Sequence, residues 1–373
     1  MSGTDWRAHF ERAQGRLLSD LEALVTRESP SDDAGRVSAL AAWIVERLRR
    51  AGVRAESRPC PPRGDAVLAS IGSGDGTLLL GHHDTVWPAG SLAEMPFRRV
   101  DVRATGPGVF DMKAGIAVAL GVMEAFAARA DPRPVSLLLT PDEEIGTQAS
   151  RALLLETARR HRQVLVLEPS LDGAAKIARK GTGRFDVRFS GRAAHAGLDP
   201  DKGASALLEL ARFTILTAGL ADEERGTTVV ATLAQGGSRA NVVPERATVT
   251  LDARVWSQAE AARLEAALRA YRATDARVGV EVEGGFDRPP LEPTPAAAAL
   301  YERARDVARS LGFELGAARV GGASDGNLTA AAGIPTLDGL GPRGDGAHAR
   351  HEFVLVSDLP VRAALLAGLI ETS

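Results

Sequence analysis

The sequence predicts an α/β protein in which helices cover both faces of a mainly parallel sheet, with a smaller α+β unit inserted into the chain. Three observations predict this architecture. Short apolar runs, such as TLLLG at 77–81 and VSLLLT at 135–140, alternate with helical patterns, as the buried strands of parallel sheets do. Between about 180 and 288 the predicted elements follow a different order, β-α-β-β-α-β. After residue 289 the first kind of pattern resumes.

The first domain supplies the strands and helices of the main sheet. The run QVLVLE at 163–168 is a third buried strand, and the segment DMKAGIAVALGVMEAFAARA at 111–130 is an amphipathic or fully buried helix. After the insertion, a helical pattern at 296–311 begins the remainder of this domain. We therefore expect a layered α/β domain made of residues 1–178 and 289–373.

The inserted domain, residues 179–288, is predicted to be a ferredoxin-like unit. In its first strand, TGRFDVRFSG, the side chains of Phe185, Val187 and Phe189 alternate onto one face, as in a half-buried strand. Its second helix begins at Ser257, and Glu260 is expected to complete a capping box there. The remaining predicted elements are a helix at 203–220 and strands at 227–235, 246–256 and 277–284.

The composition excludes several classes of function. The chain has 373 residues and a net charge of −3 with both signs interspersed, so we expect no nucleic-acid partner. No apolar run approaches the roughly 18–20 residues of a membrane span, and we expect neither membrane association nor a signal peptide. The single cysteine, Cys60, excludes an internal disulfide and a cysteine-rich metal site. The expected location is the cytoplasm.

Polar side chains follow the ends of several predicted strands. In open α/β sheets, ligands bind outside the carboxyl ends of the strands, where clustered carboxylates repel one another unless cations lie among them. The residues at these positions are His82, Asp84, Asp111, Asp142, Glu143, Glu144 and Glu168, with His348, His351 and Glu352 added by GDGAHARHEF. Two histidines with three carboxylates would hold two divalent metal ions. Without cysteine ligands we expect zinc, with manganese and cobalt as alternatives.

The motifs of the chain are recognisable in combination. In order they read GHHDTVW, GPGVFDMKAG, TPDEEIGT, LEPS, GRAAHAG, NVVPE, LDARV and GPRGDGAHARHEF. Over residues 75–355 they resemble those of the dinuclear-zinc peptidases, a family that includes glutamate carboxypeptidase, acetylornithine deacetylase, succinyl-diaminopimelate desuccinylase and aminoacylase. The chain looks most similar to the bacterial glutamate carboxypeptidases, because GHHDTVW continues with PAGSLAEMPFR and Glu168 is followed by proline.

The resemblance implies a role for each residue of the cluster. Five residues would hold the two metal ions, with Asp111 as the bridge, His82 and Glu168 on one ion, and Glu144 and His348 on the other. Asp84 would orient His82 by accepting its other ring proton. Glu143 would be the general base that takes a proton from the attacking water and hands it to the leaving amine.

The resemblance also implies a part for the inserted domain. His195 would donate a hydrogen bond to the oxyanion, while Asn241 and Arg254 would clamp a carboxylate of the substrate. Gly322 and Ser324, in the segment GGASDGN, are candidate substrate contacts. Members of this family commonly dimerise through the inserted domain, so we expect a homodimer.

The expected function is metal-dependent cleavage of an amide bond, which releases a C-terminal, glutamate-like amino acid from a small N-acyl or peptidyl substrate. An N-acyl-amino-acid deacylase of the same family is the alternative. GASDG also matches the pattern G-x-S-x-G, with Asp345 and His348 in the order of a serine hydrolase, but an elbow at Ser324 leaves little chain for the rest of such a sheet. A binding protein on an inactive peptidase scaffold is a further alternative, which the intact Glu143 disfavours.

Overall fold

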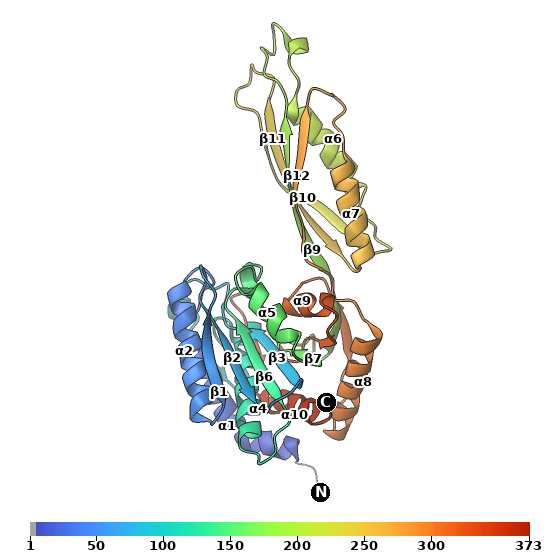
Figure 1. Ribbon diagram of the computed structural model, residues 1–373. Helices are drawn as coiled ribbons and strands as arrows, with labels where there is room; N and C mark the ends of the chain where they lie inside the picture. The colour runs from blue at the N-terminus through green and yellow to red at the C-terminus, as the bar shows by residue number, and fades with distance from the viewer. Residues whose placement is uncertain (1–4) are drawn as a thin grey trace. The chain divides into compact units, whose positions relative to one another are not determined.

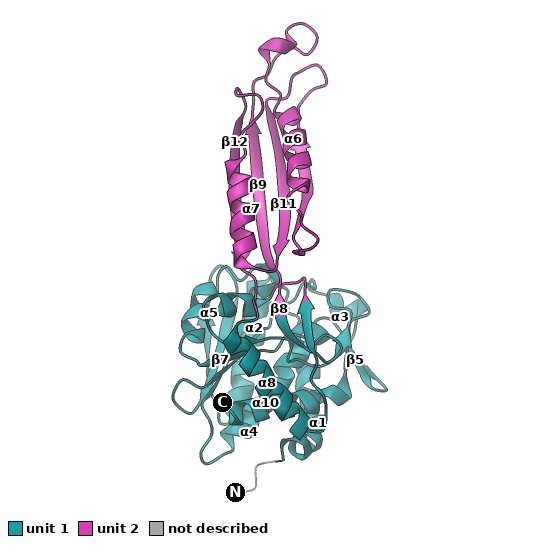
Figure 2. Ribbon diagram, turned by 90° about the vertical axis from the view of Figure 1, so that its right-hand side faces the viewer, with its two compact units in different colours: residues 1–177, 293–319, 324–373 teal, residues 178–292, 320–323 magenta. Residues whose placement is uncertain are grey.

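The structure is a computed structural model that describes residues 5–373, and the chain forms two compact units (Figure 2). Unit 1 comprises Met1–Ile177, Pro293–Arg319 and Ser324–Ser373, and unit 2 comprises Ala178–Glu292 and Val320–Ala323. Within residues 5–373, no helix combines the length and the apolar character that crossing a membrane requires.

A six-stranded mixed sheet forms the centre of unit 1 (Figure 1), with the strand order β1-β2-β6-β3-β7-β14. Strands β6, β3, β7 and β14 run parallel, whereas β2 is antiparallel to both β1 and β6. Strands β3, β6 and β7 are buried almost throughout, which explains their near-continuous apolar composition. The strands span Arg54–Pro59 (β1), Asp65–Ile71 (β2), Thr77–His82 (β3), Val135–Thr140 (β6), Gln163–Val166 (β7) and Thr336–Leu337 (β14).

Helices cover both faces of this sheet. One face packs into a large apolar core with α1, α2, α4, α8 and α10, and the other packs into a smaller core with α5 and α9. The side chains of Asp5, Asp33 and Thr294 cap α1, α2 and α8 by accepting backbone N–H groups. The helices span Trp6–Val25 (α1), Ala34–Arg50 (α2), Ala114–Ala127 (α4), Arg151–Ala158 (α5), Pro295–Ser310 (α8), Asp325–Ala331 (α9) and Leu359–Glu371 (α10).

Short elements complete the fold of this part of the chain. Four strands form a small sheet in the order β15-β16-β5-β4, and β8 (Ala175–Arg179) pairs with β13 (Ala317–Val320). The sequence patterns do not reveal the small sheet, because strands of two or three residues show no alternation. The other short elements are α3 (Ser91–Glu94), β4 (Arg98–Val100), β5 (Arg103–Thr105), η1 (Val109–Lys113), η2 (Glu143–Ile145), β15 (Gly344–Asp345), β16 (Phe353–Leu355) and η4 (Val356–Asp358).

Unit 2 is a four-stranded antiparallel sheet with α6 and α7 on one face (Figure 1), in the strand order β10-β11-β9-β12. Phe185, Val187 and Phe189 of β9 face the core between sheet and helices, as their alternation predicts. The predicted fold class, an α/β domain with an inserted ferredoxin-like unit, is confirmed. The elements span Gly181–Ser190 (β9), Pro200–Lys202 (η3), Ala206–Ala218 (α6), Thr228–Gly236 (β10), Arg246–Val255 (β11), Gln258–Ala270 (α7) and Gly279–Arg288 (β12).

One helix begins later than its pattern predicts, and the cap of another differs in part from the prediction. The helix expected at 111–130 begins at Ala114, because Asp111 and Met112 have non-helical φ/ψ angles inside η1. Asp111 therefore lies before the first turn of α4, and the regular geometry of that helix does not fix the direction of its side chain.

The second difference concerns the expected capping box of α7. Ser257 does accept the N–H group of Glu260, at 3.2 Å. The Glu260 carboxylate, however, accepts hydrogen bonds from Thr227 at 3.0 Å and from Arg225 at 3.1 Å. The carboxylate also accepts a hydrogen bond from Arg263 of the same helix, at 2.9 Å. Charged and hydroxyl partners therefore take the carboxylate that the local pattern assigned to the helix end.

Candidate metal centre

Three neighbouring parallel strands deliver polar side chains to one edge of the main sheet. His82 is the last residue of β3, Glu143 and Glu144 open the turn η2 just after β6, and Glu168 follows β7. Because β3 lies between β6 and β7 and all three run parallel, their carboxyl ends meet at the same edge. His82 and Glu168 are both buried there.

Asp111 and His348 reach the same edge from two loops. Asp111 lies in η1, before α4, and His348 lies in the loop between β15 and β16. His348 has a backbone φ of 61°, a left-handed conformation that is uncommon for residues other than glycine and is concentrated at functional sites. The two side chains meet with His348 Nε2 at 3.3 Å from Asp111 Oδ2.

The Nε2 atom of each histidine lies near two carboxylates, and Asp111 is common to both. His82 Nε2 lies 3.4 Å from Asp111 Oδ1 and 3.5 Å from Glu168 Oε1. His348 Nε2 lies 3.3 Å from Asp111 Oδ2 and 3.1 Å from Glu144 Oε2. Metal–ligand bonds of about 2.0–2.1 Å in a tetrahedron place neighbouring ligand atoms about 3.3 Å apart. The observed separations therefore fit two adjacent tetrahedral positions that share Asp111.

Two buried oxygen atoms also indicate that this cluster suits cations. Asp111 Oδ1 and Glu144 Oε1 make no hydrogen bond within the described part of the chain although both are buried, and an unsatisfied buried carboxylate oxygen is costly. Ligand atoms of His82, Asp111 and Glu144 lie within 4.8 Å of one another. A set of nitrogen and oxygen donors without sulfur suits zinc, manganese or cobalt. The residues present therefore fit a pair of divalent ions.

The electrostatics of the cluster agree with this fit. Contacts with Asp111 and Glu144 raise the pKa of His348 to about 10. Burial alone would lower the pKa of His82, but the carboxylates beside it, Asp111 foremost, raise that pKa well above its ordinary value. Burial raises the pKa of Glu144. Protons on the two histidines thus hold the carboxylates together, as a cation would, and metal binding would displace them.

Asp84 links His82 to the turn that carries Glu143 and Glu144. Its carboxylate accepts the backbone N–H groups of both glutamates, at 3.2 and 3.3 Å, and the hydroxyl of Ser31 at 2.7 Å. His82 Nδ1 lies 3.1 Å from the backbone oxygen of Asp84 and 3.4 Å from its carboxylate. The Asp84 carbonyl, and not only its carboxylate, therefore faces the ring nitrogen. No motif marks Ser31, which is 53 residues from Asp84 in the sequence.

Three further polar residues of the motifs lie outside the ligand cluster. His83 is fully buried, and burial lowers its pKa to about 4, so the ring is neutral near pH 7. His351 is exposed. Lys113 is buried, which lowers its pKa to about 7, and its Nζ donates to the backbone oxygen of Arg27 at 2.9 Å. Lys113 thus anchors the N-terminal segment beside the metal-binding loop.

Within unit 2, His195 and Asn241 lie at one end of the sheet. The Ala196 N–H group donates to the Asn241 carbonyl oxygen at 2.9 Å. His195 Nδ1 accepts the N–H groups of Gly197 and Leu198, both at 3.1 Å. Because an accepting ring nitrogen carries no proton in neutral imidazole, the proton is assigned to Nε2. The exposed His195 ring therefore presents an N–H donor.

Arg254 lies at the opposite end of the same sheet. It pairs with Thr182 at the start of β9, whereas His195 lies beyond Ser190, where β9 ends. The stretch of β9 from Thr182 to Ser190 measures about 26 Å. One unit 2 therefore cannot bring His195 and Arg254 to the same small molecule. The Arg254 guanidinium binds both carboxylate oxygens of Asp252, at 2.9 and 3.0 Å.

The glycine-rich segment around Ser324 caps a helix. Ser324 is fully buried, its hydroxyl donates to Asp338 at 2.6 Å, and with Asn327 it forms the capping box of α9. The Gly322 carbonyl accepts a hydrogen bond from Arg179 at 3.2 Å. A serine nucleophile needs an accessible hydroxyl beside a general base. The structure therefore gives no support to the serine-hydrolase alternative.

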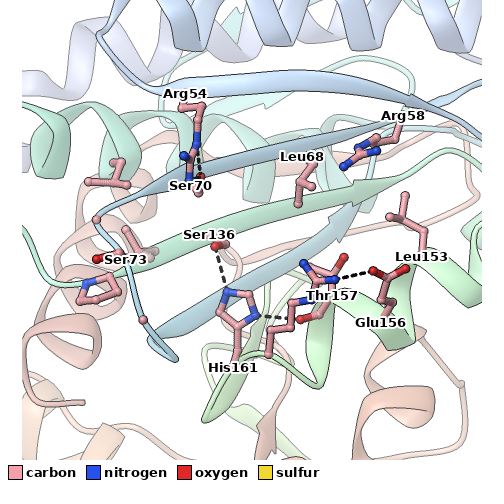
Figure 3. A pocket seen from close by; sticks show the side chains of 16 residues that line it. Arg54, Arg58, Leu68, Ser70, Ser73, Ser136, Leu153, Glu156, Thr157 and His161 are labelled. Carbon is pink, nitrogen blue, oxygen red and sulfur yellow. Dashed lines mark hydrogen bonds and ion pairs between the residues drawn. The ribbon is translucent and has the colours of Figure 1, made fainter.

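A separate cavity of about 480 Å³ lies between β1, β2, β6 and α5 (Figure 3). Arg54 and Arg58 line it from β1, and His161 contacts the Ser136 hydroxyl at 2.8 Å and the Thr157 carbonyl at 2.9 Å. Ser136 is near the start of β6, whereas the carboxylate cluster follows the end of that strand. The cavity therefore lies toward the start of β6, away from the carboxylate cluster that follows the end of that strand. Its arginines are exposed.

Comparison with known proteins connects this geometry to one family of sequences. Peptidase family M20/M25/M40 matches residues 78–372. Carboxypeptidase G2 from Pseudomonas sp. (strain RS-16) is 31% identical over 373 residues, which cover 96% of this chain and 89% of that protein. Acetylornithine deacetylase from Myxococcus xanthus is 33% identical over 192 residues, which cover 48% of this chain and 50% of that protein.

Solved structures share the fold. Aminopeptidase PepT from Bacillus cereus ATCC 10987 has a TM-score of 0.83 at 23% identity and covers 96% of this chain and 98% of its own. The YXEP protein from Bacillus subtilis, a dinuclear metal binding peptidase from the M20 family, has a TM-score of 0.71 at 16% identity, covering 96% and 98%. The resemblance found in the motifs is confirmed, and the chain belongs to peptidase family M20/M25/M40.

Proposed function

We propose that the protein is a metal-dependent hydrolase that cleaves an amide bond and releases a C-terminal amino acid from an N-acyl or peptidyl substrate. The observation that carries this proposal is the shared carboxylate, in which one oxygen of Asp111 faces His82 at 3.4 Å and the other faces His348 at 3.3 Å. We call Asp111 with His82 and Glu168 the His82 position, and Asp111 with His348 and Glu144 the His348 position. Membership of a peptidase family and similarity to carboxypeptidase G2 support the reaction class.

Two bound divalent ions would supply Lewis-acid chemistry, because such ions lower the pKa of water and polarise a carbonyl group. The residues of the chain would move the protons and stabilise the charge. Glu143 takes the proton of the attacking water on its carboxylate and passes it to the nitrogen of the leaving amine. The Nε2–H group of His195 donates to the former carbonyl oxygen as negative charge develops there. Asp84 holds Glu143 in place through its backbone N–H group.

A substrate with a carboxylate suits the side chains of unit 2. Arg254 forms a two-point pair with the Asp252 carboxylate, so a substrate carboxylate would displace Asp252 or bind the remaining guanidinium N–H groups. The exposed Asn241 would add an amide contact. Gly322 and Ser324 are weaker candidates, because the Ser324 hydroxyl is already bound to Asp338. Similarity to acetylornithine deacetylase supports an N-acyl amino acid as the second substrate class.

The test is a panel of N-acyl amino acids and dipeptides, assayed with the purified protein after metal removal and after addition of zinc, cobalt or manganese. We expect hydrolysis of the amide bond next to a C-terminal amino acid, with zinc as the native metal. We also expect a strong chelator to abolish it, while a serine-directed reagent leaves it intact. Activity that survives complete metal removal would refute the proposal.

We further propose that two copies pair through unit 2. Strand β10 is at the edge of its sheet (Figure 1), so its outer backbone groups can pair with another strand. Helix α6 packs beside it on the same sheet. Apolar side chains of both elements are exposed, which is typical of protein–protein surfaces: Leu207, Leu208, Ile215 and Leu216 of α6, with Val230 and Leu233 of β10.

Pairing would also resolve the separation between His195 and Arg254. The two residues lie about 26 Å or more apart along one sheet, so they can act on one small substrate only if they come from different copies. A two-fold axis at the β10–α6 surface makes the same contact on both copies and gives two equivalent sites.

Light scattering on an Ile215→Glu, Leu233→Glu double variant tests this surface. We expect a monomer with little activity, because the charges would be buried in the interface. Val100→Glu with Val102→Glu is the matched control, since these exposed apolar residues lie in unit 1, and it should remain a dimer. A wild-type protein that is monomeric and fully active would exclude the pairing.

We also propose a cytoplasmic location. Cys60, the only cysteine of the chain, is buried and unpaired, which fits a reducing compartment. Cell fractionation with detection by a specific antibody tests the location, and recovery of the protein outside the cytoplasmic fraction would contradict it.

A further inference from the structure

We propose that Glu352 is a positioning residue of the metal centre, which ties the backbone at Asp111 to the loop that carries His348. The proposal rests on the proposed metal-dependent function. Glu352 is 1% exposed, and the motif GDGAHARHEF places it among the polar side chains of the candidate cluster, but the implied ligand set assigns it no role. Its contacts in the structure provide one.

The Glu352 carboxylate accepts four hydrogen bonds from two other segments of the chain. Oε1 accepts the N–H groups of Phe110 at 2.8 Å and Asp111 at 3.0 Å. Oε2 accepts the N–H group of Gly108 at 2.9 Å and the indole N–H of Trp87 at 2.9 Å. A carboxylate has about four lone-pair sites, so these donors saturate it. Glu352 therefore acts on the metal centre through the backbone and not as a ligand.

The loop that meets Glu352 has little freedom to adopt another shape. Gly108 has a φ of +69°, and a Cβ atom there would lie 2.6 Å from the Thr85 side chain, so only glycine fits. The Lys113 N–H group donates to the Gly108 carbonyl at 3.0 Å and closes the turn. The turn directs its N–H groups at Glu352, while the Asp111 side chain points to the two histidines.

One carboxylate thereby sets the spacing of two ligands that share the His348 position. His348 lies in the same short loop as Glu352, and the Glu352 N–H group donates to the Ala349 carbonyl at 2.9 Å. Asp111 is held through its own N–H group. At the His82 position, His82 ends a strand of the main sheet and does not depend on this loop. Loss of the Glu352 carboxylate should therefore weaken the His348 position more than the His82 position.

Glu352→Gln tests this difference, because it keeps the shape of the side chain but replaces one accepting oxygen with an NH₂ group. Titration of the metal-stripped protein with Co²⁺, followed by visible absorption, measures the affinity of each position. We expect about 10–100-fold weaker binding at the His348 position, as is typical when a partner of a ligand is lost. The spectrum of the remaining strong position should match that of His348→Ala, which leaves only the His82 position intact.

Glu28→Gln is the matched control. Glu28 also accepts two backbone N–H groups, from Gly90 at 2.8 Å and Leu92 at 2.9 Å, but in a segment that carries no ligand. It should keep wild-type affinity at both positions. If Glu352→Gln does not fold, Trp87→Phe replaces it, since that change removes only the indole donor and should weaken the His348 position several-fold.

The outcomes separate this proposal from the proposed function. Wild-type affinity at both positions in Glu352→Gln, or in Trp87→Phe where that variant stands in, would overturn the positioning role. An equal loss at both positions would show that Glu352 acts only through the shared Asp111, and it would overturn the proposed link to the loop that carries His348. A wild-type protein that binds no Co²⁺ at all would instead refute the metal-dependent function.

Discussion

Carboxylates are buried differently in unit 2 and at the carboxyl edge of the main sheet of unit 1, although elsewhere in unit 1 the buried Asp358 is paired with Arg362. In unit 2, the buried Glu209 and Glu260 are each paired with an arginine on the same helix, at i,i+3. In unit 1, carboxylates at the edge of the sheet face one another and two histidines, and two of their oxygens make no hydrogen bond among the described residues. Buried charge is costly unless a partner neutralises it. The difference indicates that unit 2 is complete as a folded unit, whereas unit 1 keeps a site that needs cations.

Among the variants that test the proposed site in unit 1, removal of the general base should have the largest effect on turnover. Glu143→Ala should lower turnover by roughly 10²–10⁴-fold, because the other carboxylates at this edge are either proposed ligands or, like Asp84 and Asp142, accept backbone N–H groups. The variant should keep both metal ions and its stability, since Glu143 is outside the ligand set. Steady-state kinetics and metal analysis on the same sample check both points. Near-normal turnover with full metal content would remove Glu143 from the role.

Removing the carboxylate that both metal positions share should abolish cation binding in unit 1. Asp111→Ala should lose both metal ions, because one side chain serves the His82 and His348 positions. His82→Ala and His348→Ala should each lose mainly one ion. Metal analysis after exhaustive dialysis measures the stoichiometry of all three variants. If Asp111→Ala still bound two equivalents, Asp111 would not be the bridge.

Mixing two inactive variants tests whether the units of different copies cooperate. His195→Ala and Glu143→Ala should each be inactive alone. Random re-pairing makes about half of the dimers mixed, each with one complete site, so about a quarter of wild-type activity should return. Refolding the two variants together and assaying the mixture provides the measurement. No recovery from a dimeric mixture would place His195 in the site of its own copy.

A smaller effect, on KM, is expected when the guanidinium group of Arg254 is replaced. Arg254→Lys replaces a planar two-point contact with a point charge, and we expect the KM of carboxylate-bearing substrates to rise about tenfold. Arg184→Lys is the control, because Arg184 forms a similar pair with Asp186 on β9, at 3.0 and 3.3 Å. An unchanged KM for every such substrate would show that Arg254 serves only the fold.

The smallest effect is a pH dependence confined to unit 2. Hydrogen bonds from Arg263, and then from Arg225 and Thr227, outweigh the opposite effect of burial and lower the pKa of Glu260 from 4.5 to about 2. Since the folded state favours the charged form, the stabilisation is complete above pH 4.5 and is lost as pH falls through about 2. Glu260→Gln should cost about 1 kcal/mol at neutral pH, and the difference from wild type should shrink in acid. Hydrogen exchange of α7 amides across pH 2–6 measures this, and a constant difference would contradict it.

Much of unit 1 and unit 2 could be predicted because the relevant patterns are local. The apolar runs of β3, β6 and β7 predict strands that are buried on both faces of the sheet. The alternation of Phe185, Val187 and Phe189 predicts a strand that is buried on one face only. The clustering of His82, Glu144 and Glu168 follows from one rule, that parallel strands share a carboxyl edge. Those inferences need only neighbours in the sequence.

The sequence by itself determined the residue types at the ends of the strands and the order of the elements, since both depend on periodicity and on motif spacing. Only the tertiary structure decided which distant side chains support them. Ser31 reaches Asp84 across 53 residues, and Glu352 reaches Phe110 across 242. The structure also separated His195 from Arg254 along β9, although motif order alone assigns both to one site. Hydrogen bonds and distances of this kind arise when elements pack, and no local pattern of side chains encodes them.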